Sequence, residues 1–446
     1  MIFQSQMSLS NKRIFSSVNK QQHSSLLLGF CLLIFVGFSS GIKAQTAPRL
    51  SDKAEIFLLS CSPGQEVWAH YGHTGIRVLD PLTRRDVVFN YGIFDFNSDN
   101  FLWNFVRGEI DYILGTTSFE GFMHSYRNEN RRVVSQRLNL SPEEKARLWE
   151  ALVINSLPEN RTYRYSFYYD NCSTRARKII ERSLDGQVHY NFEPAYGSMR
   201  EVVQHYTAGH PWTWFGISFA LSSLADAPAP AIDLLFAPEL MMEAFDKATV
   251  SAPKTTEESS IQAERQLIDE QSILYEIKEL PAEHKNSLPG PTVLSWILFA
   301  LVLTLGLQEL KTARRYPWAD ALLFGLAGLA GVIIAFLAFV SVHPVTKVNY
   351  LLIWIQPLHL LFALLALFRP FRQSKLYKGY LKINLAVLLF ALTGFCFLPQ
   401  YVHPAMIPLL LSLLSRSLMA WINPLPKSMR NKNLPGKKSG KPSRLI

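Results

Sequence analysis

Five apolar runs near the C-terminal end constrain the fold of this chain more than any other feature. They occupy residues 291–308, 319–341, 350–368, 383–400 and 406–422. Each run is close to the length of about 20 residues that an α-helix needs to cross a bilayer. We therefore predict an all-α bundle of five transmembrane spans over 291–422, followed by a basic cytoplasmic tail at 423–446.

The charges between these runs predict the orientation of the bundle. Basic residues cluster after the first run (311–315), after the third (369–382) and after the fifth (427–444), whereas Lys347 is the only Lys or Arg in the two alternate loops. Loops rich in Lys and Arg remain in the cytoplasm. All three clusters fall on one side of the predicted bundle, so residues 45–290 are expected on the other side, outside the cytoplasm.

The net charge of the whole chain also follows from the predicted membrane topology. Residues 45–290 contain 24 Lys and Arg against 33 Asp and Glu, while the rest of the chain contains 21 basic and 2 acidic residues. The overall charge of +10 therefore reflects membrane topology, and it is not the footprint of a nucleic-acid-binding surface. We expect no nucleic-acid partner.

The remaining sequence divides into three segments. Residues 1–44 have a basic start, an apolar stretch at 26–38 and a small residue, Ala44, where cleavage would occur. This pattern is typical of a secretory signal, although the large Ile42 leaves an uncleaved anchor open. Residues 45–248 are expected to form the periplasmic catalytic domain, and the polar segment 249–290 a partly helical stalk.

The expected periplasmic domain has mixed α and β character. "TGIRVL", "DVVFN" and "RVVSQRLNL" are β-prone runs, and the first two are separated by the turn-like "DPLTRR". Ser141 followed by Pro142 and Glu144 predicts a capped helix start. These features predict an α+β domain.

Residues 168–180, "YYDNCSTRARKII", contain the best candidate for a nucleophile. Asn171 or Asp170 can cap a helix, which would place Cys172 in its first turn. The positive end of a helix and the three basic residues within 175–178 would both lower the pKa of the thiol. Cys172 is thus a candidate nucleophile.

Cysteine nucleophiles work with an imidazole that accepts and returns the proton. His73 opens the strand-like "HTGIRVLD" and is the preferred base, with His70 as the alternative. Asn90, at the end of the neighbouring β-prone run, is the candidate for orienting the imidazole.

Two other interpretations of these residues stay open. Cys61 and Cys172 are the two cysteines of the predicted periplasmic segment, and they could form a disulfide. His70 and His73 form an H-x-x-H pair that could bind zinc, but no third ligand with suitable spacing is evident.

Several stretches together resemble a known family. "SPGQEVWAHYGHTGIRVLDP", "VVFNYGIFDF", "FVRGEIDYIL" and "YRYSFYYDNCSTRARKIIE" are similar to the periplasmic domain of the Lnb lipoprotein N-acyltransferases. The order of H-x-G-I and then N-C also resembles permuted papain-like enzymes. In that group the third catalytic residue is often a second histidine, whereas this chain has Asn90 at the corresponding place.

The resemblance implies acyl transfer by a permuted papain-like domain at the inner membrane. Catalytic roles would fall to Cys172, His73 and Asn90, and substrate-binding roles to Asn171, Arg175 and His70. The acyl donor would be a membrane phospholipid and the acceptor a diacylglyceryl lipoprotein. No metal or other cofactor is implied.

Two functions from other classes compete with this interpretation. A papain-like cell-wall amidase or peptidase would keep its activity without residues 291–446. A non-catalytic binding module tethered to the membrane would be unaffected by Cys172→Ser.

Overall fold

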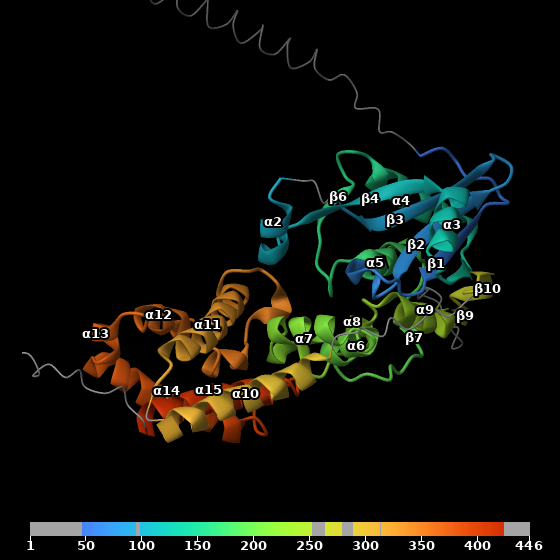
Figure 1. Ribbon diagram of the computed structural model, residues 1–446. Helices are drawn as coiled ribbons and strands as arrows, with labels where there is room; N and C mark the ends of the chain where they lie inside the picture. The colour runs from blue at the N-terminus through green and yellow to red at the C-terminus, as the bar shows by residue number, and fades with distance from the viewer. Residues whose placement is uncertain (1–46, 95–98, 252–263, 279–288, 313, 423–446) are drawn as a thin grey trace, which may run out of the picture. The chain divides into compact units, whose positions relative to one another are not determined.

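The computed structural model describes residues 47–94, 99–251, 264–278, 289–312 and 314–422 (Figure 1). The predicted signal at 1–44 and the predicted basic tail at 423–446 lie outside the described residues. The described residues from Arg49 onwards form one compact unit that contains both the sheet domain and the apolar helices.

The centre of the N-terminal domain is a seven-stranded antiparallel sheet with the order β10-β5-β1-β2-β3-β4-β6. All three β-prone runs in the sequence form strands of this sheet, which confirms the α/β character of the domain. The permuted papain-like relationship stays a prediction. The strands are β1 (Glu55–Cys61), β2 (His73–Asp80), β3 (Arg85–Ile93), β4 (Asp111–Ser118), β5 (Val133–Leu138), β6 (Thr162–Arg164) and β10 (Ile268–Tyr275).

Helices cover the sheet. Among them, α5 (Cys172–Ser183) packs against β2 and β3 (Figure 1). The capping box predicted at Ser141 is present at the start of α4 (Pro142–Ser156), which packs against α5. The other elements of this domain are η1 (Val67–Ala69), α2 (Phe101–Arg107), α3 (Phe119–Asn128), α6 (Met199–Tyr206), α7 (Pro211–Ala220), η2 (Ser223–Ala225), α8 (Ala231–Leu234) and α9 (Pro238–Asp246).

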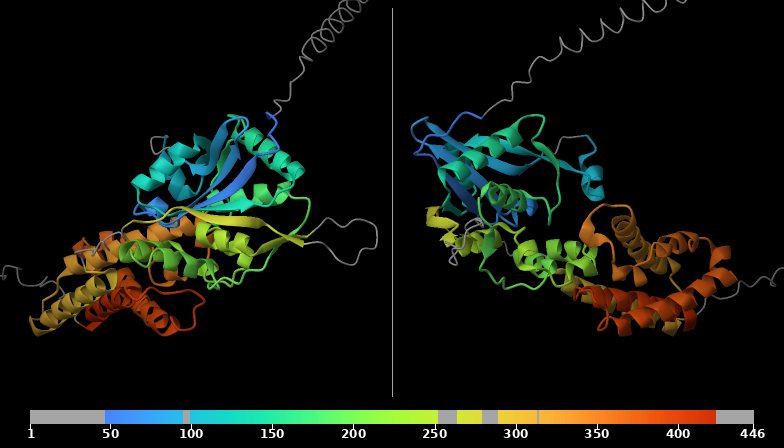
Figure 2. Two further views of the ribbon diagram at one scale, coloured as in Figure 1. Left: turned by 90° about the vertical axis from the view of Figure 1, so that its right-hand side faces the viewer. Right: turned by 180° about the vertical axis from the view of Figure 1, so that it is seen from behind.

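In the segment predicted as a partly helical stalk, most of the described residues form strands and none of them is helical. β8 (Ala248–Ser251) pairs with β7 (Val188–Tyr190) and β9 (Glu264–Gln266) in a second sheet. β10 pairs with β5 and forms one edge of the main sheet, where the yellow strand is visible (Figure 2). The described residues of this segment depart from the helix prediction because backbone groups along the edge of β5 supply hydrogen-bonding partners that outweigh the weak local preference of a polar segment. Residues 252–263 and 279–288 of the segment lie outside the described residues.

The membrane region contains fewer long helices than predicted. Among the described residues, three helices are long and apolar enough to cross a bilayer, and the bent pair Pro344–Ile353 and Leu358–Leu365 would make a fourth span. Pro357 lies at the break, where its ring and missing N–H prevent one continuous helix. The fifth predicted span is a 17-residue helix, so five spans remain a prediction. The elements are α10 (Pro291–Thr312), α11 (Pro317–Phe339), η3 (Pro344–Thr346), η4 (Tyr350–Ile353), α12 (Leu358–Leu365), α13 (Arg369–Arg372), α14 (Lys375–Gly394) and α15 (Met406–Ile422).

Four buried charges join three of these helices. The two carboxylates are Glu309 in α10 and Asp320 in α11, which are also the only acidic residues of 291–446. Arg416 of α15 contacts both, with two 3.0 Å bonds to Glu309 and a 2.5 Å bond to Asp320. Arg315 adds a second cation, 2.5 Å from Asp320. The two cations and the two carboxylates neutralise one another, and this pairing lowers the cost of burying them in an apolar region.

Replacing Arg416 by Met is expected to destabilise the membrane region strongly. The substitution removes one cation and leaves two buried carboxylates facing Arg315 alone, and breaking a buried pair in this way costs about 3–5 kcal/mol. Chemical denaturation in detergent micelles measures the loss. The control Lys382→Met removes an exposed charge from α14 and should leave the free energy of unfolding unchanged. If both variants lowered the free energy of unfolding by the same small amount, the buried pairing of Arg416 with Glu309 and Asp320 would be contradicted.

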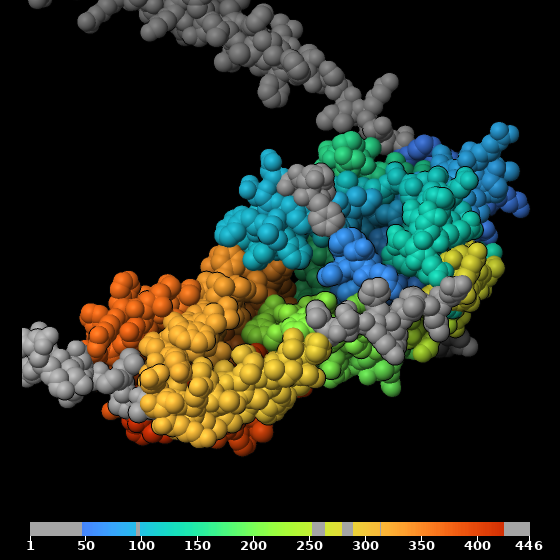
Figure 3. Space-filling view, in the orientation of Figure 1, coloured from blue at the N-terminus to red at the C-terminus, as the bar shows by residue number. Residues whose placement is uncertain are grey.

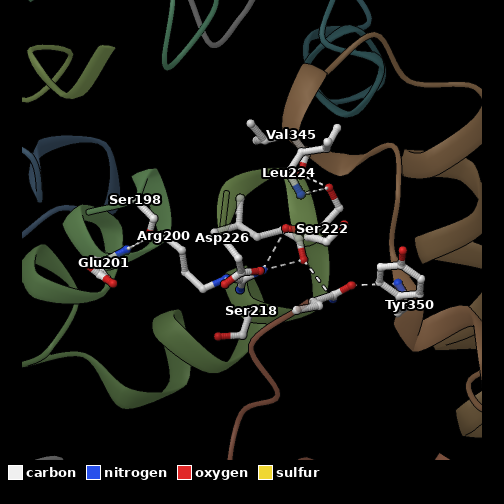
Figure 4. A network of polar contacts seen from close by, with 12 residues as sticks. Ser198, Arg200, Glu201, Ser218, Ser222, Leu224, Asp226, Val345 and Tyr350 are labelled. Carbon is white, nitrogen blue, oxygen red and sulfur yellow. Dashed lines mark hydrogen bonds and ion pairs between the residues drawn. The ribbon is translucent and has the colours of Figure 1, made fainter. Parts of the chain in front are cut away.

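A polar junction connects the N-terminal domain to the loops of the membrane region (Figure 4). The buried Arg200 guanidinium binds Asp226 at 2.6 Å and donates to the carbonyl oxygens of Leu221 and Ser222. The backbone N–H and hydroxyl of Ser222 both donate to the Val345 carbonyl at 2.8 Å. The junction fixes residues 221–226 against the loop that follows α11.

Candidate active site

Cys172 is the first residue of α5, as the sequence predicted. The Asn171 side chain caps the helix, because its Oδ1 accepts hydrogen bonds from the backbone N–H groups of Ser173 and Thr174, both at 3.0 Å. The same side chain donates from Nδ2 to the carbonyl oxygens of Phe167 and Phe236. These bonds fix the position from which the thiol projects.

His73 opens β2, and Asn90 lies near the end of β3, the next strand of the sheet. The imidazole Nε2 is 3.2 Å from Asn90 Oδ1. Because a carbonyl oxygen only accepts hydrogen bonds, Nε2 carries the proton and Nδ1 is the nitrogen with the free lone pair. Gly75 leaves room for this contact, since a Cβ there would lie 3.3 Å from Asn90 Oδ1 and 3.1 Å from Val88.

Contacts between β2 and α5 bring the two halves of the site together. Thr74 Oγ1 and Ser173 Oγ form a buried 3.0 Å hydrogen bond, and these residues directly follow His73 and Cys172. Gly92, close after Asn90 on β3, faces the cysteine, because a Cβ at Gly92 would lie 3.9 Å from Cys172 Cβ. The structure therefore places the thiol beside both strands that carry the imidazole and the amide.

The electrostatics of the thiol differ from the sequence prediction. Burial raises the pKa of Cys172 above its ordinary value, and hydrogen bonds from the Thr74 and Ser173 backbones and the Ser173 side chain only partly oppose this effect. Burial also lowers the pKa of His73 to about 4, while the Asn90 hydrogen bond acts in the opposite direction. Both pKa directions favour the uncharged forms, a protonated thiol and a neutral imidazole.

The basic residues expected to activate the thiol are occupied elsewhere. Arg175 pairs with Asp170 at 2.8 Å, and its guanidinium lies 3.6 Å from the centroid of the Tyr163 ring. Arg177 pairs with Glu181, and Lys178 donates to a backbone carbonyl. Carboxylates neutralise the two arginines and a carbonyl oxygen holds Lys178, so none of the three offsets the desolvation of the thiol. Arg175 supports the wall of the site, and its predicted role in substrate binding is not apparent from these contacts.

Two other predicted substrate-binding residues have structural contacts instead. The Asn171 amide is buried and uses both its donor and its acceptor groups within the fold. His70 is 2% exposed; its Nε2 lies 3.1 Å from the Gln65 carbonyl oxygen, and its ring stacks on that of His210 at 4.0 Å. Both residues position the loops around the site and do not face an open surface.

The two alternative interpretations receive no structural support. Cys61 and Cys172 are both free cysteines. Cys61 lies at the end of β1, opposite His73, and burial raises its pKa to about 12. Among the residues that the structure describes, no group of three His, Cys, Asp or Glu side chains could hold a metal ion.

Several residues around the thiol were not singled out in the sequence. The Tyr126 ring stacks at 6.4 Å on His73, and Tyr126 hydrogen-bonds Cys61. Tyr163 and Tyr165 also lie near the thiol, since charge on the sulfur adds to burial in raising the pKa of each phenol. The two tyrosines belong to the stretch "YRYSFYYD" at 163–170, and its high tyrosine content is the one feature of the sequence that points to them.

Comparisons with known proteins identify both parts of the chain. Residues 44–205 match the family model described as the Lnb N-terminal periplasmic domain, and residues 283–427 match the one described as the Lnb transmembrane domain. No curated protein and no solved structure matches the chain. The two matched segments contain the candidate active site and the apolar helices, respectively. The chain belongs to the Lnb lipoprotein N-acyltransferase family, with a periplasmic and a membrane-spanning part in one polypeptide.

Proposed function

We propose that this protein transfers an acyl chain from a membrane phospholipid, through a thioester on Cys172, to the N-terminal amine of a diacylglyceryl lipoprotein. The observation that carries the proposal is the convergence of Cys172, at a helix start, with the His73–Asn90 pair on two adjacent strands. A nucleophile beside a base that is itself oriented by a third group is the arrangement used for covalent acyl transfer. Membership of the Lnb lipoprotein N-acyltransferase family supports a lipoprotein as the acceptor substrate.

In the first half of the reaction, Cys172 Sγ attacks the ester carbonyl carbon of the phospholipid. His73 Nδ1 accepts the thiol proton as the S–C bond forms, which avoids a free thiolate in a site that raises the thiol pKa. The imidazolium then gives this proton to the departing glycerol oxygen as the ester C–O bond breaks. A lysophospholipid leaves, and the acyl chain remains on sulfur.

In the second half, the free α-amine of the lipoprotein attacks the thioester carbonyl. His73 takes a proton from the amine and returns it to sulfur as the S–C bond breaks, which regenerates the thiol and leaves an amide. The oxyanion in both halves needs hydrogen-bond donors. The Asn171 cap engages the N–H groups of Ser173 and Thr174, so we assign the Cys172 N–H to the oxyanion.

The membrane region suits this chemistry because both substrates keep acyl chains in the bilayer. The hydrogen bonds between residues 221–226 and the loop after α11 hold the N-terminal domain beside the apolar helices. Confinement to one surface raises the effective concentration of enzyme and substrate. We place the catalytic domain on the periplasmic side of the inner membrane.

Reconstitution tests the proposed function directly. Full-length protein in phospholipid vesicles is supplied with a synthetic diacylglyceryl lipopeptide, and mass spectrometry follows its N-terminus. The proposal predicts a mass increase of one acyl chain on the α-amine and an equal amount of lysophospholipid. Cleavage of peptidoglycan amides without any acylation of the lipopeptide would instead favour the cell-wall amidase.

Removing the Asn90 side chain should impair catalysis without unfolding the protein. Asn90→Ala frees the His73 ring to rotate, and misplacement of a catalytic group by about 1 Å can cost about 100-fold in rate. Asn90→Asp keeps an acceptor oxygen for Nε2–H and should retain more activity. The exposed Asn128→Ala serves as the control. Equal initial rates of lipopeptide acylation for Asn90→Ala and wild type would exclude an orienting role for Asn90.

A further inference from the structure

A series of aromatic rings leads from the candidate nucleophile towards the membrane helices. Neighbouring centroids are 4.0 Å apart for Tyr165 and Tyr112, 4.9 Å for Tyr112 and Phe94, 5.9 Å for Phe94 and Phe101, and 6.3 Å for Phe101 and Phe105. We call these five residues the aromatic track. The track joins β4, the end of β3 and helix α2, which are separate parts of the sheet domain.

The inner end of the track lies at Cys172. Gly92 faces the cysteine, with the 3.9 Å approach described above, and Phe94 follows two residues later along the same stretch of chain. β3 is irregular between Tyr91 and Ile93, where Gly92 has a φ of +98°, and Phe94 joins the series through its ring contact with Tyr112. Tyr165 also lies within electrostatic range of the sulfur. The inner end of the track therefore lies in the neighbourhood of the sulfur.

The outer end of the track lies at the end of α11. The backbone N–H of Val342 and the Ser341 hydroxyl both donate to the Arg107 carbonyl, at 2.8 and 3.1 Å. The Trp103 ring is 5.4 Å from that of Phe336 in α11, and His343 Nε2 is 3.0 Å from the Phe105 carbonyl oxygen. Figure 3 shows the cyan-blue surface of α2 bordering the orange surface of residues near 340. By the charge pattern of the loops, this end of α11 faces the periplasm.

Exposure is greatest at the outer end of the track. Tyr112 is 8% exposed, Tyr165, Phe94 and Phe101 are half-buried, and Phe105 is 46% exposed. Next to Phe105, α2 also exposes Leu102 (73%) and Trp103 (53%), and the helix contributes no buried residue to the core. Core packing therefore does not explain its apolar side chains. Apolar and aromatic residues exposed at the end of a membrane helix are typical of contact with lipid.

We propose that the aromatic track binds the acyl chain of the phospholipid donor and guides it from the bilayer to Cys172, with α2 lying in the membrane interface. This inference rests on the proposed function, since it names the surface that holds the transferred chain. The rings offer apolar faces in successive ring-to-ring contacts that end at the helix beside α11. Two other apolar stretches, "PWTWFGISFAL" and "IDLLFAPELMMEAF", supply packing instead: Phe215 and Phe219 of α7 contact the core of the membrane helices, and Phe236 and Phe245 are buried.

Photolabelling tests binding independently of chemistry. The full-length Cys172→Ser protein is placed in nanodiscs that contain a phospholipid with a diazirine on its acyl chain, and labelled peptides are mapped after irradiation. We expect labels on Phe94, Phe101 or Phe105 in addition to those on the membrane helices. Labels confined to the membrane helices and α7 would overturn the proposal.

A comparison of two acyl donors tests the role of the track in catalysis. Phe101→Ala should lower acylation of Cys172 by a long-chain phospholipid about 10-fold, the scale on which apolar pockets discriminate, and leave acylation by a short, water-soluble ester within about 2-fold. Trp212→Ala removes an exposed ring of α7 outside the track and should change neither rate. Equal losses with both donors in Phe101→Ala would overturn the proposal. A third outcome separates the two proposals: the track is photolabelled, but Cys172 of the wild-type protein accepts no acyl group from either donor. This result would refute the thioester mechanism and still support acyl-chain binding by the track.

Discussion

Replacing Cys172 by Ser should abolish N-acylation of lipoproteins while the protein still folds and inserts. Loss of a catalytic nucleophile costs about 10⁴-fold or more in rate. A serine hydroxyl is a far weaker nucleophile than a thiol beside the same neutral imidazole, because its proton is much harder to remove. The change replaces sulfur by oxygen at a partly exposed position in the first helical turn, so we expect little effect on stability. Mass spectrometry of a lipoprotein N-terminus measures the outcome.

Cys396→Ser is the matched control for this variant. Cys396 is an exposed free cysteine of the membrane region, and its replacement should leave N-acylation unchanged. Cys61 is less suitable, because it is buried in the sheet beside Tyr126. An N-acylated lipoprotein from cells whose only such enzyme is the Cys172→Ser variant would show that the thiol is dispensable and would favour a non-catalytic role for this residue.

The pH dependence of the reaction should reflect a neutral cysteine–histidine pair. The pKa of His73 is lowered to about 4, so the imidazole is an unprotonated base above that pH and loses this function as the pH falls through about 4. The pKa of the Cys172 thiol is raised, so its thiolate fraction stays small near neutral pH and grows with increasing pH. We therefore expect kcat/KM to be nearly constant from about pH 5 to pH 8 and to fall below about pH 4.5.

The pH dependence of Cys172 alkylation distinguishes a neutral cysteine–histidine pair from a preformed thiolate–imidazolium pair. With a protonated thiol, the rate of Cys172 modification by iodoacetamide should rise about 10-fold for each pH unit between about pH 6 and pH 8. A thiolate–imidazolium pair would instead react at a high and nearly constant rate over that range. Such a plateau, absent from Cys172→Ser, would contradict the pKa directions derived from burial.

The local features of the site were predictable because they depend on near neighbours in the sequence. The helix start at Asn171–Cys172 follows from capping preferences, and the β2 and β3 strands follow from β-prone composition. Asn90 follows from its place at the end of the run beside the His73 strand, and the structure places its side chain at hydrogen-bonding distance from His73. Its catalytic role, like that of Cys172, stays a prediction.

The features that were missed depend on contacts between distant segments. β10 is a strand because β5 offers it an edge, and no pattern within residues 264–278 indicates that partner. The pKa of Cys172 is raised because the folded domain buries the thiol, whereas the sequence shows only the nearby positive charges. Arg175 illustrates the same point, since its pairing with Asp170 and Tyr163 removes the positive potential expected from it.

Trapping the acyl-enzyme tests the central claim most directly. Wild-type protein is incubated with phospholipid vesicles in the absence of any lipoprotein acceptor, and the peptide that contains Cys172 is then analysed by mass spectrometry. We predict an acyl group on this cysteine that hydroxylamine removes and that is absent from His73→Ala. If lipopeptide acylation proceeds at the normal rate while Cys172 never carries an acyl group, the covalent mechanism built on this cysteine and histidine is wrong.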